Sequence, residues 1–105
     1  MITAVRTAGV HYGKFADAVA WAVKTTNYLR GTLGTNTQLM RNVAGSVYQL
    51  HWVSAHESLA ELEKTMKRVE ADEGYKTLLR EARQQELFVA ASIVDAIYES
   101  IPLGS

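Results

Sequence analysis

The spacing of apolar residues changes along the first third of the chain. Residues 2–11 are rich in threonine and valine, and this composition is typical of a β-strand. Between residues 14 and 30 the apolar positions recur at helical spacing, which predicts a helix with one buried face. That face consists of Phe15, Ala18, Val19, Ala22, Thr26 and Leu29. Gly31 follows the last turn, and we expect it to adopt the left-handed conformation that often ends a helix.

The middle of the chain predicts a hairpin and then the start of a second helix. Residues 36–43 and 47–55 have the composition of strands, and the connection at residues 44–46 is short enough to join them as neighbours. Ser58 then begins a helix, because its hydroxyl can accept a hydrogen bond from the amide of Glu61, whose side chain can reach back.

The second helix is interrupted, and a last strand follows it. An apolar stripe continues to about residue 85, with a break at residues 72–74, and residues 87–101 then read as a strand entered through a short loop at 90–92. The order βαββαβ with right-handed crossovers predicts a ferredoxin-like α+β fold. We therefore expect a single domain over residues 1–105, with a four-stranded antiparallel sheet and two helices on one face.

The predicted strands leave neither face of the sheet polar. In the third strand Leu50 and Trp52 point to one side and Val53 points to the other, and the last strand is also apolar on both sides. A sheet with helices on one face and water on the other should alternate apolar and polar residues. Because a wet apolar face is costly, we expect a homodimer through this sheet face, in which the two sheets enclose a barrel-like interior.

Composition and charge exclude several classes of protein. Eleven basic and eleven acidic residues give a net charge of zero, which argues against nucleic-acid binding. The chain has no cysteine, so disulfides, thiolate metal sites and a cysteine nucleophile are excluded. No apolar run approaches the ~20 residues that cross a bilayer, and the first residues do not read as a secretory signal. We expect a cytoplasmic domain without nucleic-acid or membrane partners.

Three stretches of the chain are similar to motifs of a known superfamily. They are residues 51–61 (HWVSAHESLAE), residues 72–79 (DEGYKTLL) and residues 87–92 (LFVAAS). They resemble a strand running into a Ser-Leu-Ala helix start, a mid-helix break and a strand entry of the dimeric α+β-barrel superfamily, and within it the NIPSNAP-like and antibiotic-biosynthesis-monooxygenase-like groups. The second stretch lacks the usual proline, and the third lacks its proline and glycine. The resemblance implies the fold and the dimer, and carries no catalytic signature.

Metal and cofactor sites are not expected. The histidines His11, His51 and His56 do not form a pair at metal-ligand spacing, and a metal site needs about three converging ligands. Some relatives in the superfamily hold or degrade haem with a helical histidine in the second half of the chain. Residues 58–85 contain no histidine, so we expect no metal and no cofactor.

Arg6 is the main candidate for recognition of a ligand. It lies mid-strand on the same face as Ala4 and Ala8, whose small side chains leave room around it. A guanidinium in that place could hold a carboxylate or a phenolate. The ordinary alternative is that Arg6 forms an ion pair with Asp95 or Glu99.

Aromatic side chains of the third strand complete the candidate site. Trp52 and Tyr48 share a strand face and could line an apolar cavity, with their polar atoms orienting the ligand. His51 is the polar partner if the strand faces the other way. The expected ligand-binding residues are therefore Arg6, Tyr48, His51 and Trp52.

Two functions are compatible with these residues. The first is binding of a small apolar or amphipathic molecule, such as a fatty acid or an aromatic acid, in the interior of the barrel. The second is a cofactor-independent monooxygenase, cyclase or isomerase that acts on a phenolic or quinol-like substrate. We favour binding because the sequence shows no converging acid–base set, and whether the protein is an enzyme stays open.

Overall fold

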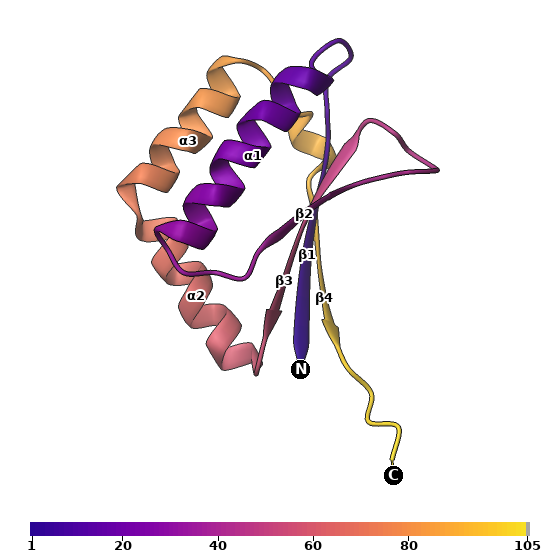
Figure 1. The fold of residues 1–105 in the computed structure, drawn as a ribbon, viewed down its shortest axis with the longest axis vertical. Coiled ribbons are helices and arrows are strands. Elements are labelled where there is room, and N and C mark those ends of the chain that lie inside the picture. Colours follow the sequence, from indigo (N-terminus) through magenta and orange to yellow (C-terminus); the bar gives the residue numbers. More distant parts are fainter. Residues whose placement is uncertain (105) are drawn as a thin grey trace.

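In the computed structural model, which describes residues 1–104, a four-stranded antiparallel sheet forms one layer and three helices cover one of its faces (Figure 1). The strands are β1 (Ile2–Gly9), β2 (Gln38–Arg41), β3 (Gln49–His56) and β4 (Val94–Glu99), in the spatial order β2-β3-β1-β4. The helices are α1 (Phe15–Gly31), α2 (Leu59–Ala71) and α3 (Glu73–Gln84). The expected ferredoxin-like α+β fold is confirmed, with the second predicted helix divided into α2 and α3.

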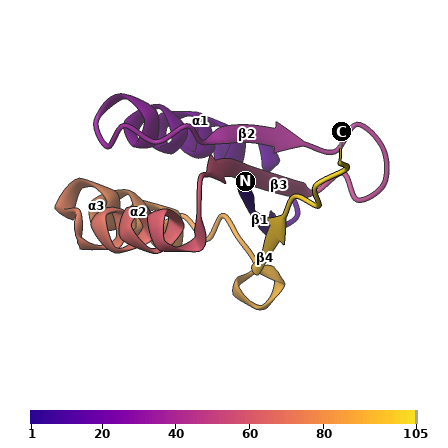
Figure 2. The same ribbon diagram turned by 90° about the horizontal axis from the view of Figure 1, so that it is seen from below.

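The helices lie on one side of the sheet, and the other side carries none of them. Figure 2 shows α1 in one row and α2 with α3 in another, both on the same side of the strands. The core lies where α1 and α3 approach the sheet. Its buried members are Val10, Ala18, Trp21, Ala22, Leu50, Leu78, Ala82 and Leu87.

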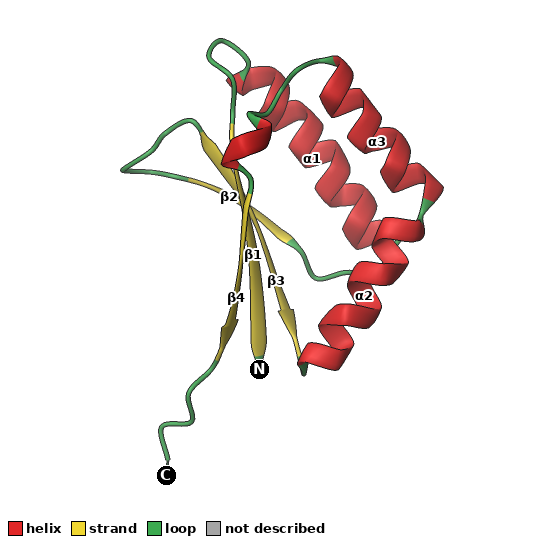
Figure 3. Cartoon of the chain, turned by 180° about the vertical axis from the view of Figure 1, so that it is seen from behind, coloured by secondary structure: helices red, strands yellow, loops and turns green. Residues whose placement is uncertain are grey.

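Two of the predicted strands are shorter in the structure. β2 pairs with β3 only through residues 38–41, so the connection at residues 42–48 is longer than the tight turn that we expected. Before β4, residues 90–92 form a 3-10 turn (Figure 3), and residue Phe88 makes a single bridge with Val10. Ser92 explains this break, because its hydroxyl accepts a hydrogen bond from the Gly9 amide at 2.8 Å and closes the turn against β1.

The prediction for Gly31 is wrong. Gly31 is the last residue of α1, and the amide of the next residue, Thr32, still bonds to the carbonyl of Tyr28 at 2.9 Å. The left-handed residue is Gly34, with φ of 69°. The chain therefore continues for three residues beyond the helix before it turns toward β2, and a glycine without a side-chain penalty stands at that later point.

The break between α2 and α3 lies at Asp72, inside the stretch that the sequence indicated. Asp72 is extended (φ −75°, ψ 125°), and its Oδ2 accepts hydrogen bonds from the Tyr75 amide at 2.9 Å and from the Tyr28 hydroxyl at 2.7 Å. The hydrogen bond from Tyr28, and then that from the Tyr75 amide, lower the pKa of Asp72 below its ordinary value. One carboxylate thus caps α3 and ties it to α1.

The start of α2 gives a first prediction. The Ser58 hydroxyl accepts from the Glu61 amide at 3.2 Å, as the sequence indicated, whereas the Glu61 carboxylate lies near Lys64. Ser58→Ala should therefore lower the free energy of unfolding by about 0.5–2 kcal/mol through loss of this cap. Thermal unfolding measures the change, with Ser46→Ala in the exposed β2–β3 connection as the control. An unchanged melting temperature for Ser58→Ala would contradict the prediction.

The close packing at Gly74 gives a second prediction. A Cβ atom on Gly74 would overlap the Tyr28 hydroxyl oxygen and would lie 3.2 Å from Asp72 Oδ2. Gly74→Ala should therefore displace Tyr28 and break its hydrogen bond to Asp72, and the melting temperature should fall. Because Tyr28→Phe removes the same hydrogen bond, the two substitutions together should cost less than the sum of their separate effects.

Gly31→Ala is the matched control for Gly74→Ala. A Cβ on Gly31 meets nothing within 4 Å, and its backbone is helical. This substitution should leave stability unchanged or raise it by about 0.5–1 kcal/mol, because alanine restricts the unfolded chain more than glycine does. The prediction fails if Gly31→Ala and Gly74→Ala change the melting temperature equally. It also fails if the effects of Gly74→Ala and Tyr28→Phe on stability are fully additive, because the contact between Gly74 and Tyr28 would then not contribute.

Candidate functional site

A cavity of about 780 Å³ lies between the sheet and the helices. Its wall on the sheet side is formed by residues of β1, β3 and β4 that point toward the helices, at every second position along each strand. These residues are Ala4, Arg6, Ala8, Trp52, Ser54, His56, Asp95 and Ile97. As the sequence indicated, the small side chains of Ala4 and Ala8 leave space beside Arg6, and this space is part of the cavity.

Arg6 lies at the centre of this wall. In the antiparallel register Arg6 is opposite Trp52 on β3 and opposite Asp95 on β4, so the three side chains point to the same side. Arg6 Nε donates to Asp95 Oδ1 at 2.7 Å, and Arg6 Nη2 donates to Asp95 Oδ2 at 2.8 Å. The ordinary alternative for Arg6, an ion pair with Asp95, is what the structure shows.

The ion pair remains accessible. The side chains of Arg6 and Asp95 are 46% and 50% exposed. The hydrogen bond from Arg6 holds the pKa of Asp95 below its ordinary value, and the same hydrogen bond raises the pKa of Arg6. Both groups are therefore charged at neutral pH, and the pair contributes little to stability because it is half exposed.

Aromatic rings form the apolar part of the cavity beside Arg6. Trp21, Trp52 and Phe88 meet edge to face, with ring centroids 5.4 to 6.3 Å apart. Trp21 Nε1 donates to the Leu78 carbonyl at 2.8 Å, and Trp52 Nε1 donates to the Thr26 hydroxyl at 3.2 Å. Both tryptophans are held in place by these bonds, and both line the cavity.

The helices supply the opposite wall. Met66 and Val69 of α2 and Tyr75 and Leu79 of α3 line it, on both sides of the break at Asp72. Burial raises the pKa of the Tyr75 phenol, while the charge of Arg6 acts against this shift. Tyr75 is therefore a neutral hydroxyl that lines the same cavity as the ion pair.

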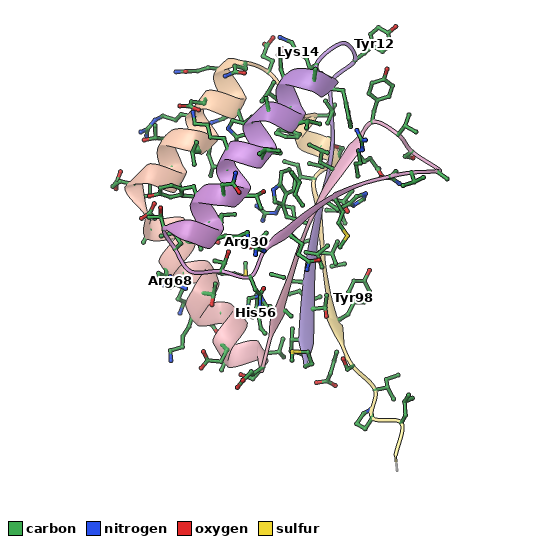
Figure 4. All side chains as sticks on the ribbon, viewed as in Figure 1. Tyr12, Lys14, Arg30, His56, Arg68 and Tyr98 are labelled. Carbon is green, nitrogen blue, oxygen red and sulfur yellow. The ribbon has the colours of Figure 1, made fainter. Side chains whose placement is uncertain are left out.

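A second polar group lies farther along β3. The Ser54 hydroxyl and His56 Nε2 are 2.8 Å apart, and both residues line the cavity. Figure 4 shows His56 on the helix side of the sheet and Tyr98 on the opposite side. Since His56 is opposite Ile2 in the register, it lies four residues along β1 from Arg6. The cavity thus has polar groups at two separate places.

The structure brings together two of the four predicted site residues. Arg6 and Trp52 are neighbours in the cavity. Tyr48 is not part of it, because it precedes β3 and packs against Tyr12 and Phe15 at the end of the sheet, with ring centroids 6.0 and 5.9 Å away. Tyr48 therefore lies apart from Arg6 and Trp52 and does not line this cavity.

His51 is also outside the cavity. Its side chain points to the helix-free side of the sheet, where Nδ1 lies 2.8 Å from the Thr7 hydroxyl and Nε2 lies 2.6 Å from Asn42 Oδ1. Arg6 and His51 therefore face opposite sides, and the fallback role that we assigned to His51 does not apply to this cavity.

Sequence reasoning missed several residues of the cavity. Ser54 and His56 share the alternation that begins at Trp52, so strand periodicity alone could have placed them on the same face as Arg6. Tyr75 and Thr25 carried no comparable signal. The hydroxyl of Thr25 is a buried oxygen without a hydrogen-bond partner in the described part of the chain, and Thr25 itself borders the cavity.

Neither a metal cluster nor a membrane span is found among residues 1–104. No group of three or more histidine or acidic side chains in this range could hold a metal ion. None of its helices has the length and the apolar character that a bilayer crossing requires.

The chain has structural relatives but no matching family model and no matching curated protein. A NIPSNAP family protein of unknown function from Agrobacterium tumefaciens superposes with a TM-score of 0.80 at 16% identity, over 99% of this chain and 91% of that one. An uncharacterized NIPSNAP domain protein from Burkholderia xenovorans gives 0.80 at 11% identity, over 100% and 99%.

A second group of similar structures is named after an enzymatic activity. A putative antibiotic biosynthesis monooxygenase from Deinococcus radiodurans superposes with a TM-score of 0.69 at 10% identity, over 100% of this chain and 97% of that one. At such identities the likeness concerns the fold alone. This chain therefore has the ferredoxin-like α+β fold that is also found in NIPSNAP family proteins and in antibiotic biosynthesis monooxygenases.

Proposed function

We propose that this protein binds a small apolar or amphipathic molecule in the cavity between its sheet and its helices. The observation that carries the proposal is the cavity of about 780 Å³, whose walls combine an aromatic cluster with a half-exposed ion pair. Ligand pockets in proteins commonly measure ~300–1,000 Å³, and they are mostly apolar with a few polar groups.

The position of the cavity changes the expected location of the ligand. The sequence suggested the interior of a barrel formed by two facing sheets. The cavity lies instead on the helix side of the sheet, within one copy of the chain. A molecule of the size of a fatty acid or an aromatic acid fits this volume, and the polar end of an amphipathic ligand would meet the Arg6–Asp95 pair.

Binding is favoured over catalysis because Asp95, an acidic group in the cavity, is a weak proton acceptor. Asp95 is the carboxylate nearest to the aromatic cluster by register, but its hydrogen bonds from Arg6 lower its pKa. A carboxylate with a lowered pKa is a weak proton acceptor at neutral pH. The alternative, a cofactor-independent monooxygenase, cyclase or isomerase, is supported only by the shared fold, and oxygen uptake with quinols in air would test it.

We further propose that a second copy of the chain covers the helix-free side of the sheet. This side carries Val5, Val53, Val94 and Tyr98, and in the single chain Val94 and Tyr98 are 59% and 58% exposed. Apolar side chains gathered on one face are typical of a surface that pairs with another protein. A two-fold pairing of equal surfaces is the simplest way to bury it.

Nile red, an uncharged apolar dye, tests the binding proposal. Its emission should rise when it enters the cavity, and the fluorescence of Trp21 and Trp52 should change with it because both line the wall. Ala4→Leu should weaken binding by about tenfold or more, because the larger side chain fills the cavity beside Ser54 and Ile97. Ala20→Leu is the matched control, since Ala20 is an exposed residue of α1 that lies outside the cavity lining.

The binding proposal fails if the wild-type protein does not bind the dye. It also fails if Ala4→Leu and Ala20→Leu bind it equally well, because the dye would then occupy another surface.

Native mass spectrometry tests the dimer. The wild-type chain should appear as a dimer at micromolar concentration, and Val94→Lys should convert it to a monomer by placing a charge in the buried face. Val23→Lys is the control, because Val23 is an exposed residue of α1 and lies away from that face. A wild-type monomer, or a Val94→Lys variant that remains dimeric, would contradict the proposal.

A further inference from the structure

We infer that the molecule bound in this cavity carries an uncharged hydrogen-bonding head, a hydroxyl or a carbonyl group, which binds at the Arg6–Asp95 pair. The inference rests on the proposed function and specifies the ligand class of the same site. It also corrects the expectation from the sequence that Arg6 grips an acidic head.

The geometry of the pair decides what it can bind. Asp95 uses both of its oxygens on Arg6, at 2.7 and 2.8 Å, so the positive charge of the guanidinium is already balanced. A carboxylate head on the ligand would have to displace Asp95 or lie beside it, and two carboxylates at one guanidinium repel each other. An ammonium head would be repelled by the positive charge of Arg6 at the same place.

The charges around the rest of the cavity act in the same direction. Among the described lining residues, two arginines (Arg6 and Arg83) stand against three carboxylates (Glu70, Glu86 and Asp95). The lining therefore has no surplus positive charge to offer an anion. An anionic head would be removed from water without a free partner, and this is expensive.

An uncharged head finds both kinds of hydrogen-bonding partner. A guanidinium has five N–H groups, and Arg6 uses one on Nε and one on Nη2 for Asp95, so donors remain. Each carboxylate oxygen of Asp95 keeps a lone pair that can accept from a hydroxyl. Both side chains are about half exposed, so a hydroxyl or carbonyl can reach the pair.

The position of Trp52 makes the site observable. Trp52 is directly opposite Arg6 in the sheet, so the atoms next to the head would lie against its ring. The apolar remainder of the ligand would extend past Ala4 and Ile97, the pair of opposed residues next to Arg6 and Asp95 on the same side of β1 and β4.

Three molecules with the same ten-carbon chain test the inference at pH 7: decanol, decanoate and decylammonium. The affinity of each compound is measured by its displacement of bound Nile red, and the tryptophan fluorescence is recorded in the same titration. The wild-type protein should bind decanol most tightly. Because decanol is also the least soluble in water, the decisive quantity is the ratio of decanol to decanoate affinity in wild type and variants.

Asp95→Asn should change this ratio by about tenfold or more in favour of decanoate, because it leaves the charge of Arg6 without a partner. Glu99→Gln removes the next carboxylate on the same side of β4, outside the cavity lining, and should leave the ratio unchanged. The pair is half exposed, so both variants should fold, and circular dichroism checks this. As a second test, Arg6→Gln should shift the preference toward decylammonium.

The inference is overturned if wild type binds decanoate or decylammonium at least as tightly as decanol, or if Asp95→Asn leaves the ratio unchanged. In either case binding of Nile red would still support the proposed function. If neither the dye nor any ten-carbon compound binds, the proposed function itself fails.

Discussion

The pairing of β1 with β3 on one side and with β4 on the other is the constraint on which the candidate site depends. β1 is a central strand, and its register places Arg6 between Trp52 and Asp95. Because directly opposed residues in an antiparallel sheet point to the same side, one register sets both the ion pair and its contact with the aromatic cluster. A shift of one residue in either pairing would turn Arg6 away from one of its partners.

The break between α2 and α3 at Asp72 sets the position of the wall that faces these strands. The Asp72 carboxylate caps α3 and accepts a hydrogen bond from Tyr28 of α1, so it holds the two rows of helices together where α2 ends. As a result, residues from both sides of the break, Met66 and Tyr75 among them, face the sheet across the cavity. The small residues Ala4 and Ala8 on β1 keep the space between the two layers open.

The two faces of the sheet have different chemistry, and the two proposals follow from that difference. The helix side combines paired charges, hydroxyls and aromatic rings around an open volume, which suits an amphipathic ligand. The opposite side carries valines and a tyrosine, with His51 satisfied by Thr7 and Asn42, which suits a second protein surface. A strand that alternates its side chains can serve both purposes at once.

The sequence by itself determined the order of the elements, the start of α2 at Ser58 and the break near Asp72, because these signals act over a few residues: periodicity, a side-chain cap and a turn. It also singled out Arg6 and Trp52, because small neighbours and strand alternation are local patterns. Only the tertiary structure decided that Arg6 is paired with Asp95, which lies 89 positions away in the chain. It also decided that the cavity is on the helix side, and that Tyr48 and His51 lie outside it. Strand register and the packing of layers join residues that are distant in sequence, and no local pattern specifies which of them meet.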